Sequence, residues 1–178
     1  MLETIIKTIW FFLPAASANM APVIFKRLPI LSAPLDFNYT IFGKPILGKN
    51  KTWRGLLVGI IFSIIITYFQ KAFYTEIKFL TIINYSEISV LLFGFLQGFG
   101  ALFGDALKSF FKRQLKKEPG TNWPPFDQID WIIGANFFIS IYIWLDVKYI
   151  FYSIIILTVL HPLINLIGYK LNLKNNRF

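Results

Sequence analysis

Long apolar runs alternate with short polar segments along the whole chain. A bilayer core of ~30 Å requires about 20 mostly apolar residues for one helical crossing. Runs of about that length occur at approximately 5–25, 55–75, 88–110, 129–147 and 149–170. The pattern predicts an all-α integral membrane protein, a single polytopic domain over residues 1–178 with about five transmembrane helices. The last two spans are close enough in sequence to form a tight helical hairpin.

The composition supports a membrane protein and excludes several kinds of site. Of the 178 residues, 56% are hydrophobic and only 15% are charged, which is too apolar for an ordinary soluble domain. The chain has no cysteine and a single histidine, His161, so disulfides, thiolate sites and multi-histidine zinc sites are excluded. The net charge of +9 is typical of basic cytoplasmic loops in a membrane protein, and we expect no nucleic-acid partner.

The distribution of basic residues predicts the orientation in the cell membrane. With five spans and the N-terminus outside, only Lys7, Lys71, Lys78 and Lys148 of the 18 basic residues face outward. The positive-inside rule therefore predicts an outer N-terminus and a cytoplasmic C-terminus. The inner segments then carry Lys26, Arg27, Lys44, Lys49, Lys51, Arg54, Lys108, Lys112, Arg113, Lys116, Lys117, Lys170, Lys174 and Arg177.

The first inner loop ends in a cluster of groups that suit an anion. Gly48–Gly55 holds Lys51, Thr52 and Arg54 where the second span begins. Backbone N–H groups at the start of a helix and basic side chains both bind phosphate. The alternative is that these cations only anchor the loop to anionic lipid.

A second polar cluster begins inside the third span. Asp105, Lys108, Ser109, Lys112 and Arg113 follow an uninterrupted apolar run. At ~100° per residue they share an arc of roughly 140° on one helix face. Ionisable residues within a span usually face a partner or an aqueous cavity, which favours a functional role. The alternative is a simple ion pair of Asp105 with a nearby lysine.

Two further carboxylates, Asp127 and Asp130, stand where the fourth helix begins. Their i, i+3 spacing puts both on one helix face, where they repel one another unless a cation bridges them. Together with Asp105 they offer hard oxygen ligands suited to Mg²⁺, completed by water and substrate phosphates. The alternative is that Asp127 caps the helix and Asp130 is solvated. The whole set suits phosphoryl or nucleotidyl transfer to a lipid.

The same residues resemble the CTP-dependent phosphatidate cytidylyltransferase family. Ser109-Phe-Phe-Lys112-Arg113 and Asp127-Gln-Ile-Asp130 fit its Ser-x-x-Lys-Arg and Asp-x-x-Asp signature. The family's His-Gly-Gly is absent, and Trp123-Pro-Pro stands there. This departure, with the segments Asn19-Met-Ala-Pro22, Lys51-Thr-Trp-Arg54-Gly55 and Gly104-Asp105, is similar to the compact archaeal-type branch, the CDP-archaeol synthases.

The resemblance implies a Mg²⁺-dependent reaction of CTP with a lipid phosphate in the membrane, giving a CDP-lipid of the archaeol or diacylglycerol type and pyrophosphate. It implies a metal and triphosphate role for Asp105, Asp127 and Asp130. Phosphate neutralisation would fall to Lys51, Arg54, Lys108, Lys112 and Arg113, with hydrogen bonds to phosphate from Thr52 and Ser109. Asn19 would line the lipid groove or act in helix packing.

Other classes of protein stay open from the residues alone. A small membrane transporter or channel would place polar residues across the bilayer midplane, whereas the ionisable residues here gather at one end of the spans. Gly94-x-x-x-Gly98 and Gly100-x-x-x-Gly104 allow close helix packing, either within the chain or in a homodimer. His161-Pro162 is interpreted as a kink rather than a relay.

Overall fold

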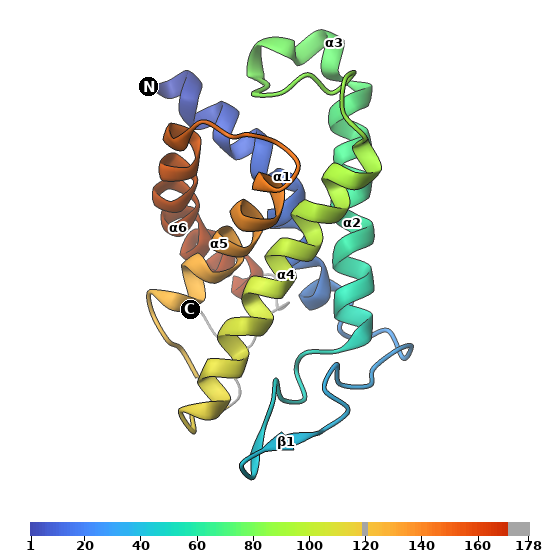
Figure 1. The fold of residues 1–178 in the computed structure, drawn as a ribbon, viewed down its shortest axis with the longest axis vertical. Coiled ribbons are helices and arrows are strands. Elements are labelled where there is room, and N and C mark those ends of the chain that lie inside the picture. Colours follow the sequence, from blue (N-terminus) through green and yellow to red (C-terminus); the bar gives the residue numbers. More distant parts are fainter. Residues whose placement is uncertain (119–120, 171–178) are drawn as a thin grey trace.

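The computed structural model describes residues 1–118 and 121–170 of the chain. Its helices are α1 (Leu2–Ile24), α2 (Trp53–Ala72), α3 (Tyr74–Ile77), α4 (Val90–Gln114), α5 (Phe126–Ser140) and α6 (Val147–Lys170), with a 3₁₀ turn η1 (Lys78–Leu80). Two short antiparallel strands, β1 (Thr40–Ile41) and β2 (Lys44–Pro45), form a hairpin. The long helices make one bundle with the hairpin at one end and α3 at the other (Figure 1), which we call the hairpin end and the α3 end.

The five long helices correspond to the five predicted spans, which confirms the all-α membrane class. Within the described residues, Trp53–Ala72, Val90–Gln114 and Val147–Leu166 are long and apolar enough to cross a bilayer. Helix α1 has 23 residues, and its first turns carry the ion pair between Glu3 and Lys7. Lys174 and Arg177, which entered the predicted charge distribution, lie outside the described residues, as does Gly120.

Helix α5 is shorter than the pattern predicts. It has 15 residues, or ~22 Å at 1.5 Å per residue, and ends at Ser140 rather than near 147. The apolar run continues, but Asp146 starts the next helix by accepting the backbone N–H of Lys148 at 2.9 Å. The chain therefore needs the intervening residues for the turn between α5 and α6.

Helix α4 lies between α2 and α5 and meets each through glycines. A Cβ on Gly94 would lie 2.7 Å from Ile64 Cα in α2. A Cβ on Gly100 would lie 2.7 Å from the carbonyl oxygen of Gly134 in α5, and one on Gly104 would collide with the carbonyl oxygen of Asp130. Both glycine pairs therefore serve close packing inside the bundle.

Buried uncharged polar side chains occupy the bundle toward the α3 end. Pro14 lacks an N–H, so the carbonyl of Trp10 four residues earlier in α1 loses its helical partner. The Gln70 amide of α2, which is fully buried, donates to that carbonyl at 2.6 Å. Gln97 of α4 donates to the neighbouring carbonyl of Phe11 at 3.4 Å. The Gln70 bond therefore satisfies a backbone carbonyl that has no water available inside a membrane, and the Gln97 bond adds a second tie to α1.

The long loop between α1 and α2 folds back against the hairpin end. The Asp36 carboxylate accepts backbone N–H groups from Leu47 at 2.7 Å, Gly48 at 2.9 Å and Asn38 at 3.1 Å. Burial opposes ionisation of Asp36, but these donors outweigh it and hold the pKa of the carboxyl below its usual range. The loop is therefore an ordered part of the fold.

Candidate active site

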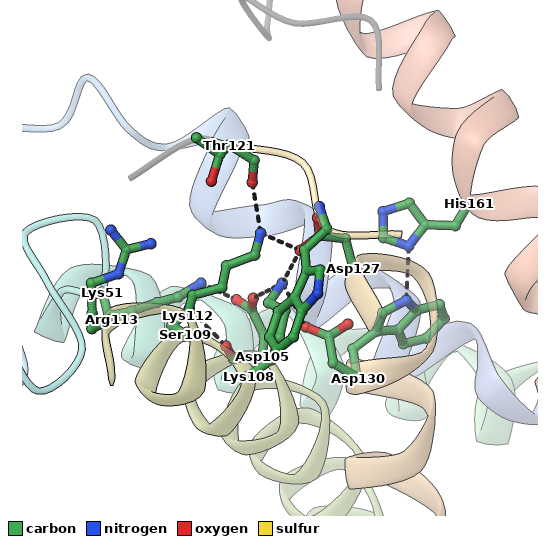
Figure 2. Close-up of polar contacts among 12 residues, drawn as sticks. Lys51, Asp105, Lys108, Ser109, Lys112, Arg113, Thr121, Asp127, Asp130 and His161 are labelled. Carbon is green, nitrogen blue, oxygen red and sulfur yellow. Dashed lines mark hydrogen bonds and ion pairs between the residues drawn. The ribbon is translucent and has the colours of Figure 1, made fainter. Parts of the chain in front are cut away.

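Three carboxylates meet one ammonium group where α4 and α5 come together (Figure 2). The Nζ of Lys108 lies 3.1 Å from Asp105 Oδ1, 2.9 Å from Asp127 Oδ1 and 2.8 Å from Asp130 Oδ2. The lysine and Asp105 come from α4, and the other two carboxylates come from the first turns of α5. The cation that the repelling carboxylates require is thus supplied by the chain itself.

These charges are largely removed from solvent. The Lys108 side chain is 14% exposed and that of Asp130 is 6% exposed. Isolated charges at such depth are strongly unfavourable, and paired ones are retained only when the geometry is good. Removing one partner therefore leaves an uncompensated buried charge. We call Asp105, Lys108, Asp127 and Asp130 the charge cluster.

Two more lysines surround the charge cluster. Lys51 forms an ion pair with Asp105 from the loop before α2. Lys112, one turn after Lys108 on α4, contacts Asp127 Oδ1 at 2.6 Å and the carbonyl oxygen of Thr121 at 2.7 Å. The prediction of a shared face is confirmed for Asp105, Lys108 and Lys112, because Lys108 contacts Asp105 and both lysines reach Asp127. Arg113, which was predicted on the same face, lines a separate cavity.

The loop segments beside the charge cluster are tied to it by backbone bonds. Leu35 donates to the carbonyl of Lys51 at 2.7 Å, which holds Lys51 in an extended segment facing α4. The backbone N–H of Trp123 donates to Asp127. Asp127 therefore joins α5, the preceding loop and both α4 lysines.

The remaining predicted residues make other contacts. The Ser109 hydroxyl donates to the Asp105 carbonyl of its own helix at 2.9 Å. Thr52 caps α2 by accepting the Gly55 N–H at 3.2 Å, and Arg54 donates to the Leu28 carbonyl. Thr52 and Arg54 therefore stabilise the conformation of the loop beside the charge cluster. Asn19 lies half-buried on α1.

Arg113 marks a second hollow at the hairpin end. Its side chain is buried, donates to the Glu118 carbonyl at 3.3 Å, and borders a cavity of about 420 Å³. The cavity lies between the first loop and the end of α4, and its lining includes Asp36, Asn38, Lys44, Lys49, Arg113 and Lys116. Its basic lining adds to the positive potential beside the charge cluster.

Sequence reasoning missed Asp36 and Lys44 as organisers of this region. Lys44 donates to the Gln114 carbonyl at the end of α4 at 2.6 Å, where a cation also suits the negative end of the helix. Asp36 holds the backbone of Leu47 and Gly48. The unusual length of the loop was the available signal, but neither contact follows from local spacing.

The sequence matches a known family over its whole length. The profile of the CarS-like family, described as CDP-archaeol synthase, matches residues 1–178. The chain belongs to this family. A CDP-archaeol synthase of Archaeoglobus fulgidus is 35% identical, with 98% of each chain covered. One from Methanococcus maripaludis is also 35% identical, covering 98% of this chain and 97% of the relative.

A solved structure has the same fold. It is described as an intramembrane enzyme for archaeal membrane lipids biosynthesis. The TM-score is 0.69 with 27% identity, and the match covers 89% of this chain and 92% of the other. The likeness agrees with the helical bundle and with its place in a membrane.

Proposed function

We propose that this protein transfers the cytidylyl group of CTP to a lipid phosphate in the membrane, giving a CDP-lipid and pyrophosphate. Family membership supports the reaction class. The observation that carries the proposal is the charge cluster, with Lys51 and Lys112 beside it, at the junction of α4 and α5. Nucleotidyl transfer depends mostly on positioning and charge stabilisation, which such a cluster can supply.

The reaction forms one phosphorus–oxygen bond and breaks another. An oxygen of the lipid phosphate attacks the α-phosphorus of CTP, and the bond from that phosphorus to the bridging oxygen breaks. The bonding pair leaves with pyrophosphate, whose added charge needs compensation. Lys51, Lys108 and Lys112 already contact the carboxylates and would share that role as these ion pairs loosen. Arg113, the residue after Lys112, would add to it from the neighbouring cavity.

The donor set fits Mg²⁺ in kind. Asp105, Asp127 and Asp130 offer carboxylate oxygens, and Mg²⁺ in proteins is commonly held by one or two carboxylates with substrate phosphates and water. No group of three acidic, histidine or cysteine residues in residues 1–118 and 121–170 is arranged as a metal cage. Lys108 lies among the carboxylates instead. The carboxylates would therefore hold Mg²⁺ only together with the substrate's phosphates. When bound, Mg²⁺ would neutralise phosphate charge.

The remaining assignments extend the proposal. The hairpin end would face the cytoplasm, with the N-terminus outside, because the basic loops gather there and CTP is a cytoplasmic nucleotide. Asn19 would line the groove that admits the lipid. Thr52, Arg54 and Ser109 would contact phosphate after giving up some of their present bonds.

The test is an assay of the purified protein in uncharged detergent. Labelled CTP and Mg²⁺ are offered with either an archaeal ether-lipid phosphate or ester phosphatidic acid. We expect a labelled CDP-lipid and equimolar pyrophosphate, with the two lipids ranking the tail preference. Absence of a CDP-lipid with both substrates, from a protein that is folded and binds Mg²⁺-CTP, would contradict the proposal.

A further inference from the structure

One buried hydrogen bond joins α5 to α6 beside the charge cluster. The indole Nε1–H of Trp131 donates to Nδ1 of His161 at 2.9 Å, and the Trp131 side chain is almost completely buried. An indole N–H can only donate, so at this depth it needs an acceptor. Figure 2 shows His161 approaching from α6, on the side of α5 away from the α4 lysines.

Trp131 directly follows Asp130, the most buried carboxylate of the charge cluster. Neighbouring residues of a helix point ~100° apart, so one faces α4 and the other faces α6. Asp130 and Trp131 lie on the same turn of α5. Any roll of α5 about its axis therefore moves the Asp130 carboxylate and the Trp131 indole together.

On the α6 side, the bond from Trp131 to His161 restrains such a roll close to the charge cluster, while the Asn136 amide donates to the Ser153 hydroxyl of α6 at 3.0 Å more than one turn further along. Pro125 occupies its N-cap position and makes no side-chain capping bond. Near Asp130 the contact with α4 is made by the backbone at Gly104 and Gly134, whereas Phe138 packs edge-to-face against Phe99 and Phe103 of α4 about two turns further along. A helix with side chains has a radius of ~5–6 Å, so a roll of about 20° would displace a carboxylate by ~2 Å. Misplacements of ~1 Å can cost two orders of magnitude in rate.

We propose that His161 is a positioning residue for this site: by accepting the Trp131 N–H, it fixes the roll of α5 and holds Asp130 toward Lys108. The inference rests on the proposed function for its effect on turnover. His161 acts through Trp131. Its unprotonated Nδ1 is the acceptor, which a glutamine oxygen can replace and a leucine cannot.

Four variants test the pair: His161→Leu, His161→Gln, Trp131→Phe and the double variant Trp131→Phe/His161→Leu. Turnover is measured at saturating CTP, Mg²⁺ and lipid, well below each melting temperature. We expect about a tenfold loss for His161→Leu, with most of it restored in His161→Gln. In the Trp131→Phe background, His161→Leu should add little further loss, because the donor is already gone. Trp144→Phe is the matched control, since Trp144 is 95% exposed.

A second measurement needs no turnover. In protein labelled with 5-fluorotryptophan, the fluorine resonance of Trp131 is assigned as the one that is absent from the spectrum of Trp131→Phe. Lys108→Met should shift that resonance, because release of Asp130 changes the roll of α5, while the Trp144 resonance should stay in place. If no lipid is converted at all, the proposed function fails, and the resonance still decides this inference.

Three results would overturn the inference. One is wild-type turnover in His161→Leu below its melting temperature. The second is an equal loss from His161→Leu with and without Trp131, which would mean that His161 does not act through the indole. The third is a Trp131 resonance whose chemical shift is unchanged by Lys108→Met.

Discussion

The two ends of the bundle bury polar side chains in opposite ways. At the hairpin end, carboxylates and lysines form the charge cluster, whose members depend on one another. Toward the α3 end, Gln70 and Gln97 are neutral and bond to backbone carbonyls of α1 beside a proline. The neutral groups complete the secondary structure. The charged groups pair with one another, and under the proposed function they would exchange partners when the charged substrate binds.

The largest effect should come from removing the shared cation. Lys108→Met should reduce turnover by about 100-fold or more, because charge stabilisation in a water-poor site is lost. The three freed carboxylates should then attract a divalent cation, so Mg²⁺ without CTP should raise the melting temperature of Lys108→Met more than that of the wild type. Lys78→Met, at the α3 end, is the control and should leave both quantities unchanged. Equal turnover in the two variants would contradict the role of Lys108.

The glycine contacts of α4 allow the positioning of Asp130 to be tested separately from helix packing. Gly104→Ala should reduce turnover about tenfold, because the added Cβ meets the backbone of Asp130 and moves its carboxylate. Gly94→Ala adds the same methyl group against Ile64 of α2, away from the charge cluster. Both should lose about 1–3 kcal/mol of stability to overpacking. Turnover of folded protein should fall only in the first variant, and a matching fall in Gly94→Ala would remove the distinction.

Gln70→Leu should lower the stability of the fold and leave turnover unchanged. It leaves the Trp10 carbonyl unpaired beside Pro14, at about 1 kcal/mol. Thermal unfolding in detergent measures the loss, and turnover at low temperature measures the chemistry. Unchanged stability would show that water or another group satisfies that carbonyl.

The smallest effect concerns the loop held by Asp36. A carboxyl whose pKa is lowered in the fold stabilises it above the pKa of the unfolded chain, and this contribution disappears as pH falls through the folded pKa. Asp36→Asn should therefore be less stable than the wild type at neutral pH, with the difference closing in acid. Proteolysis of the loop across pH 3–7 measures it, expressed relative to a pH-matched wild type. A difference that persists unchanged in acid would contradict the ionised-carboxylate account.

The sequence predicts the helices and the acidic residues of the charge cluster because those features are local. Spacing alone put Asp105, Lys108 and Lys112 on one face, and Asp127 and Asp130 on another. It did not reveal that Lys108 stands among all three carboxylates, since that depends on how closely the glycines bring α4 to α5. Local spacing is silent on such contacts between distant segments.

The early end of α5 and the contact of His161 with Trp131 were not predicted, for related reasons. Ile141–Leu145 is apolar enough to continue a helix. However, α6 starts directly after Asp146, whose carboxylate accepts the Lys148 N–H, so the preceding residues form the turn between the helices. The kink at His161-Pro162 stays a prediction, and the bond of His161 to Trp131, 30 positions earlier in the sequence, was not predicted. Both outcomes are decided by tertiary contacts rather than by residue pattern.

The most direct test compares one variant from each end of the bundle. Asp130→Asn and Gln97→Leu each replace one buried polar group, and turnover at saturating CTP, Mg²⁺ and lipid is measured beside the melting temperature. We expect Asp130→Asn to lose about 100-fold in turnover while still folding, and Gln97→Leu to melt lower with turnover intact. Near-normal turnover in folded Asp130→Asn would contradict the claim that the charge cluster is where the reaction occurs.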